Sequence, residues 1–185
     1  IKFEKPAMPS DMDEIIAATE GLKDEGYDDE VQVLKDAETA LSNSIEQRRL
    51  VTAPSEAFVI ERLQGVEGVG EITALTEESD QNRLLGKQGS YYAKIVFASP
   101  LVDQSRVIGS NLAERGIDAG GSIEVFETEE AAKKRCDYIA TYDGTFMKAG
   151  THAVIGTVLV RTSDELTASQ QKQLEANIIA ALTRL

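Results

Sequence analysis

The sequence contains a single histidine and a single cysteine, and these two side chains set the first limits on its chemistry. His152 has the side-chain pKa nearest neutrality and Cys136 is a potential thiol nucleophile. One imidazole and one thiol are too few for the usual zinc site, so we expect neither a transition metal nor a cofactor. Cys136 falls in mid-helix on the same side as Ala132 and Ile139, where a free cysteine behaves as a small hydrophobic residue. We therefore predict that neither residue is catalytic.

Glycine and carboxylate clusters provide no recognisable site either. The glycines of residues 65–70 follow a predicted helix and precede a strand, the reverse of the order in a dinucleotide-binding loop. Residues 86–87 resemble the end of a phosphate-binding loop, but its other required positions hold Gln81 and Gln88. The acidic clusters at 28–30 and 77–80 lack the alternating ligands of a calcium loop, so we interpret them as solvated surface.

Aromatic residues at loop–strand junctions are the best candidates for binding. Tyr91, Tyr92 and Tyr142 combine apolar area with a polar tip, and His152 lies at a similar junction. These four residues form the predicted binding patch. We also expect at least half of the aromatic residues at such junctions to pack in the core instead.

The charge of the chain limits its partners. The 185 residues carry a net charge of −13, of which −9 lies in residues 1–47. An acidic chain repels phosphate backbones and anionic membrane surfaces, so we expect no nucleic-acid partner. We expect membrane attachment only through an anchor ahead of Ile1, because no apolar run approaches the ~20 residues of a membrane span. Lys133–Arg135 are consecutive on a helix and point in different directions, so they do not form one basic row.

Hydrophobic spacing predicts an acidic helical hairpin in residues 1–51. Ser10 is a plausible cap for a first helix that ends before Gly26. A second helix over 28–50 has a narrow stripe that includes Leu34 and Leu41. We expect this extension to be separate from a main domain at 52–185.

The main domain reads as helix, strand, strand, strand, helix, strand, helix. This order predicts the α+β class, with a mixed or antiparallel sheet of about four strands and helices packed on one face. Residues 153–161 form the strongest predicted strand, and two apolar faces favour a central position. The other predicted elements are a helix beginning at Pro54, strands near 69–76, 91–98 and 122–126, a helix capped by Thr128, and a final helix with a Thr167–Gln170 capping box.

Two stretches carry a resemblance to a known group of proteins. They are residues 120–126, leading into 131–144, and residues 150–157, leading through 160–163 to 167–171. Over 53–185 the chain resembles the extracytoplasmic region of poorly characterised, membrane-anchored lipoproteins of Gram-positive bacteria. The resemblance implies a cell-surface location, and it brings no functional residues with it.

Together these features favour a non-enzymatic, extracytoplasmic domain that binds a partner of unknown identity, either a protein or a ligand of the cell envelope. Two alternatives stay open at this point. One is a hydrolase that uses carboxylates, and the other is an oligomeric scaffold assembled through the N-terminal helices.

Overall fold

The structure is a computed structural model and describes residues 28–144 and 150–185. Contacts divide the chain into two units, residues 1–43 and 44–185. The first predicted helix lies outside the described residues, whereas the second is present as α2 (Asp28–Leu50), with the predicted bounds. The second unit begins ahead of the predicted boundary at residue 51, and Val51 is buried in its core.

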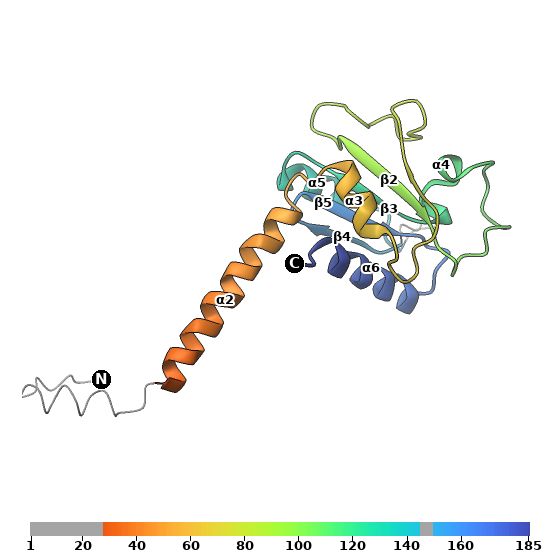
Figure 1. Cartoon of the computed structure of the whole chain (residues 1–185). Coiled ribbons are helices and arrows are strands. Elements are labelled where there is room, and N and C mark those ends of the chain that lie inside the picture. Colours follow the sequence, from red (N-terminus) through yellow and green to blue (C-terminus); the bar gives the residue numbers. More distant parts are fainter. Residues whose placement is uncertain (1–27, 145–149) are drawn as a thin grey trace, which may run out of the picture. The chain divides into compact units, whose positions relative to one another are not determined.

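The second unit is built on a five-stranded antiparallel sheet (Figure 1). The strand order is β1-β2-β3-β5-β4, and every neighbouring pair is antiparallel. The strands are β1 (Ile72–Ala74), β2 (Ala93–Ala98), β3 (Gly120–Val125), β4 (His152–Ile155) and β5 (Val158–Thr162). The α+β class and the antiparallel sheet are confirmed, with five strands where about four were expected.

The additional strand comes from residues 153–161, which were predicted as one strand. The segment is a hairpin, β4 and β5, in which Ile155 pairs with Val158 across the two-residue turn Gly156–Thr157. Gly156 has a φ of +56°, which suits glycine at the first turn position of a tight hairpin. The prediction of a central strand holds for β5, which lies between β3 and β4, and is wrong for β4, which is an edge strand.

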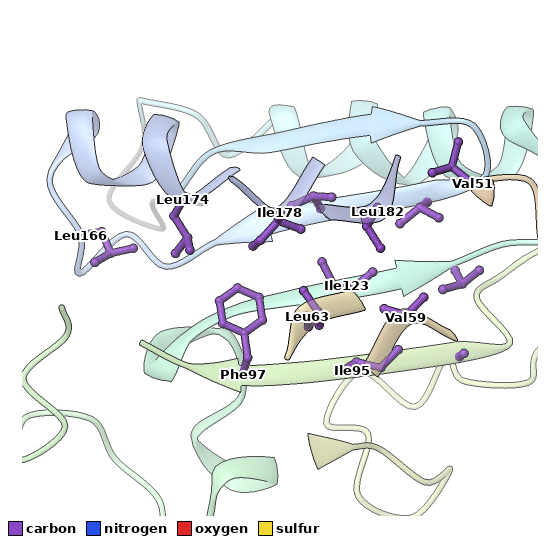
Figure 2. Packing of buried hydrophobic residues seen from close by; sticks show 14 of the residues in the cluster. Val51, Val59, Leu63, Ile95, Phe97, Ile123, Leu166, Leu174, Ile178 and Leu182 are labelled. Atoms are coloured by element: carbon purple, nitrogen blue, oxygen red, sulfur yellow. The ribbon is translucent and has the colours of Figure 1, made fainter. Parts of the chain in front are cut away.

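Helices cover both faces of the sheet rather than one. Successive residues of a strand point to opposite faces, and residues of both sets are buried in the inner strands. On one face α3 (Glu56–Leu63) and α6 (Ala168–Leu182) cover the larger core (Figure 2). On the other face lie α5 (Glu129–Ala140), the short α4 (Leu112–Arg115) and the 3-10 turn η1 (Gly116–Ala119). The two faces therefore have separate cores.

Side-chain caps fix where the helices begin. Thr128 caps α5, and Thr167 with Gln170 forms the predicted capping box of α6. The prediction that Pro54 begins the third helix is wrong, because Ser55 is the N-cap of α3 and its hydroxyl accepts the Phe58 N–H. Such caps satisfy N–H groups that have no partner within the helix.

We expect Ile178→Ala to destabilise the protein by about 2–5 kcal/mol, because Ile178 is fully buried between α6 and the sheet. Urea unfolding measures the loss. Lys172→Ala, at an exposed position of the same helix, is the matched control and should change stability by less than about 0.5 kcal/mol. Equal stabilities of the two variants would show that α6 contributes little to the core.

Candidate functional site

Charged side chains are buried on the sheet face that α5 covers. Lys94 of β2 and Glu124 of β3 are register partners, and Arg161 of β5 is diagonal to Glu124. Arg135 reaches the same place from α5, and Asp80 comes from the loop between β1 and β2. These five residues, here called the charge cluster, come from five separate segments of the chain.

Ion pairs connect the members of the charge cluster. The ammonium of Lys94 lies 2.9 Å from a carboxylate oxygen of Asp80 and 4.0 Å from one of Glu124. Glu124 also accepts a hydrogen bond of 3.1 Å from Nε of Arg135, and its Oε1 lies 3.6 Å from Nη1 of Arg161. Glu124 is 0% exposed, so these cations replace the water that would otherwise solvate its charge.

Asp80 organises the loop that joins β1 to β2. Its carboxylate accepts the backbone N–H groups of Leu84 and Leu85, the hydroxyl of Tyr91 at 2.7 Å and the Lys94 ammonium. Burial alone would raise the pKa of Asp80, but the hydrogen bonds from Lys94, Tyr91 and Leu84 outweigh it and lower the pKa to about 2. Burial and the bond to Asp80 raise the pKa of the Tyr91 hydroxyl. The carboxylate is therefore charged and the hydroxyl protonated near neutral pH.

Positive charge is in excess within the charge cluster, which holds three cations and two carboxylates. Burial lowers the pKa of Arg161, an effect that Glu124 opposes and the nearby Arg135 reinforces. Nε of Arg161 and Oε1 of Glu124 are buried without a hydrogen-bond partner among the described residues. The same holds for Oγ of Ser122 and Nδ1 of His152, which flank Arg161 on the neighbouring strands. The polar groups around Arg161 are thus incompletely satisfied by protein.

A cavity of about 770 Å³ opens beside the charge cluster, between α5 and the loop at 82–90. Arg135 and Arg161 line it together with two exposed lysines, Lys87 and Lys134. Among the described residues none of its lining side chains is acidic, although the whole chain carries a net charge of −13. The remaining lining residues are Asn82, Leu84, Gln88, Gly89, Ser90, Phe126, Ala131, Tyr138, Ile139 and Tyr142. We call this cavity the basic pocket.

The four residues of the predicted binding patch do not meet in one place. Tyr91 is fully buried beneath the loop, and the exposed Tyr92 donates its hydroxyl to the carbonyl of Pro54. Tyr142 lines the basic pocket, with its hydroxyl 2.7 Å from that of Tyr138. His152 lies on the edge strand β4, with Nε2 3.6 Å from Asp143, and lines a different cavity.

Sequence reasoning missed the charge cluster itself. The sequence did contain an indication of it: Lys94, Glu124 and Arg161 each interrupt a run of strand-forming apolar or small residues. Charged residues at inward-facing strand positions are rare unless they are paired. The run Lys133–Arg135 does separate as expected: Arg135 points into the charge cluster, whereas Lys133 pairs with Glu129.

Cys136 is half-buried on α5 and packs against the core of that face together with Ala132 and Ile139. Burial and the neighbouring carboxylates of Asp137 and Asp143 raise the pKa of its thiol. A protonated thiol is a poor nucleophile, which supports a structural role. Within 28–144 and 150–185, no group of three or more His, Cys, Asp or Glu residues is arranged to hold a metal ion.

We expect Asp80→Asn to lower stability at pH 7 by about 3–5 kcal/mol, because it leaves Lys94 buried without its closest counter-charge. The pKa of Asp80 falls from 3.8 to about 2 on folding, so its contribution is complete above about pH 4 and is lost as the pH falls towards 2. Urea unfolding at pH 7, 4 and 2.5 should show the stability difference between the two proteins to be smallest at the lowest pH. Asp137→Asn, at an exposed position of α5, is the control. A difference that stays constant from pH 4 to 2.5 would contradict this assignment.

Comparison with known proteins found no match: no family model matches the chain, and no curated protein or solved structure matches it either. Of the helices in the described ranges, none combines the length and the apolar character needed to cross a bilayer.

Proposed function

We propose that this chain is a non-enzymatic binding domain and that the basic pocket holds the anionic group of its ligand. The observation that carries the proposal is the set of four basic side chains lining one cavity of a strongly acidic chain. Two of them, Arg135 and Arg161, are also fixed in place by the buried carboxylate of Glu124. A preorganised guanidinium loses little freedom when it binds an oxyanion, which favours binding.

The ionisation of the charge cluster favours binding over catalysis. A general acid or base works best with a pKa near the working pH. The pKa of Asp80 is about 2, and Glu124 raises the pKa of Arg135, so both groups keep fixed charges around neutrality. The carboxylate-based hydrolase considered above would need a carboxyl group that exchanges protons with a substrate. Asp80 and Glu124 are instead buried and held by cations.

The proposed location is extracytoplasmic, at the cell surface and attached to the membrane through a lipidated N-terminal region. Its support is the lipoprotein-like resemblance of residues 120–144 and 150–171. A non-enzymatic domain that captures an anionic ligand suits such a position, because the ligand then has direct access to the pocket.

The anionic part of the proposal predicts specific stabilisation by oxyanions. Phosphate or sulfate at 100 times its dissociation constant stabilises a folded protein by about 2.7 kcal/mol, which thermal unfolding detects. We expect this shift for the wild type relative to chloride at matched ionic strength. The shift should be lost in Arg161→Gln and kept in Arg106→Gln, whose side chain is exposed and outside the pocket. Equal shifts in the two variants would refute the pocket as the site.

The proposed location predicts that the protein is accessible from outside an intact cell. The gene product with its natural N-terminus, expressed in a Gram-positive host, should react with a membrane-impermeant amine reagent at exposed lysines such as Lys134 and Lys172. Mass spectrometry identifies the modified residues, and a cytoplasmic protein of the host serves as the control. Modification only after cell lysis would contradict the location.

A further inference from the structure

Basic and apolar side chains both line the basic pocket, and a small anion would contact only the basic ones. Besides the basic residues, the lining includes the half-buried Leu84 and Ala131 and the exposed ring of Tyr138, whereas Phe126 and Ile139 are almost fully buried. Leu84 and Ala131 pack against the core of this face of the sheet. The pocket therefore has an apolar wall that a bare inorganic ion would leave uncovered.

The charge cluster limits the charge of a matching ligand to about one unit. Lys94 forms an ion pair with Asp80, and Glu124 forms ion pairs with both Arg135 and Arg161. Its two carboxylates leave one positive charge uncompensated among its three cations. At the pocket rim, Lys87 lies 3.7 Å from Glu77, so part of its charge is already matched. One negative charge on the ligand neutralises the buried excess, whereas a second would need compensation from the solvated lysines.

The volume of the pocket fits one small molecule. Sites for small molecules measure roughly 300–1,000 Å³ and are usually apolar with a few polar groups that fix orientation. The basic pocket, at about 770 Å³, has this size and this mixture of side chains. A carboxylate matches the planar guanidinium groups of Arg135 and Arg161 and carries the required single charge.

We infer that the basic pocket binds a small amphiphilic carboxylate, with its head group at Arg161 and Arg135 and its aliphatic body against Leu84, Ala131 and Tyr138. This inference rests on the proposed function and makes it more specific. The guanidinium groups select the charge, and the apolar wall selects the body of the ligand. Affinity then depends on both parts of the molecule.

Calorimetric titration of the full chain with acetate, butanoate, hexanoate and octanoate tests the inference. Burial of one methylene contributes about 0.8 kcal/mol, so the affinity should rise about fourfold per methylene until the pocket is filled. Octanol and octyltrimethylammonium keep the apolar body without the negative charge, and we expect each to bind at least tenfold more weakly than octanoate. Inorganic phosphate, the fifth anion, reports on anion binding without an apolar body.

Substitutions separate the two parts of the recognition. Arg161→Gln should weaken octanoate at least tenfold, and Arg106→Gln should leave it unchanged. Leu84→Asn, at a half-buried wall position, should reduce the gain in affinity per methylene, whereas Arg106→Gln should keep it. If Arg161→Gln fails to fold by circular dichroism, Arg135→Gln takes its place, and the chain-length series on the wild type decides independently.

Two outcomes would overturn the inference in distinguishable ways. Phosphate binding with the same affinity for acetate and octanoate would leave the proposed function standing and refute the amphiphilic ligand. Absence of binding by every anion, in a protein with a normal unfolding transition, would refute both. Octyltrimethylammonium binding as tightly as octanoate would show that the apolar wall acts without the arginines, and would likewise refute the inference.

Discussion

Burial of the Glu124 carboxylate in the middle of the sheet is the constraint on which the α5 face depends. An ion that leaves water loses several kcal/mol of solvation, which only close, well-placed counter-charges restore. Lys94, Arg135 and Arg161 are those counter-charges, and they come from β2, α5 and β5. The need to keep all of them at Glu124 fixes the register of three strands and the position of the helix, because a one-residue slip would turn Glu124 into the core under α3 and α6, away from these cations.

The two faces of the sheet differ in the side chains that they bury. The face under α3 and α6 carries the larger apolar core, with Ile178 and Leu182 fully covered (Figure 2). The α5 face accommodates charged groups beside an apolar core, and it also holds the basic pocket. Buried polar groups without hydrogen-bond partners on the α5 face destabilise the fold. The packed apolar core on the other face offsets this cost.

Local patterns were sufficient to predict the helices of the domain and most of its strands. The spacing of apolar residues gave α2 its bounds, and the caps Thr128 and Thr167 located α5 and α6. The hairpin at Gly156 was missed because both of its strands are apolar, so the segment looked like one long strand. Of the four residues in the predicted binding patch, only Tyr142 lines the basic pocket. The sequence shows where a tyrosine stands relative to the predicted strands and loops, but not whether its side chain is exposed. Exposure depends on tertiary contacts: Tyr91 is buried because the loop that contains Asp80 covers it.

The sequence by itself determined the α+β class, the starts of α2, α5 and α6 and the acidic character of the chain, because these follow from neighbouring residues and from composition. It also contained the unusual charges within apolar strands, at Lys94, Glu124 and Arg161. Only the tertiary structure decided that these charges meet, that Arg135 joins them and that the four basic side chains enclose one cavity. The reason is physical: the members of such a cluster are separated by tens of residues, and strand order, strand register and the packing of α5 and the β1–β2 loop bring them within a few ångströms of each other.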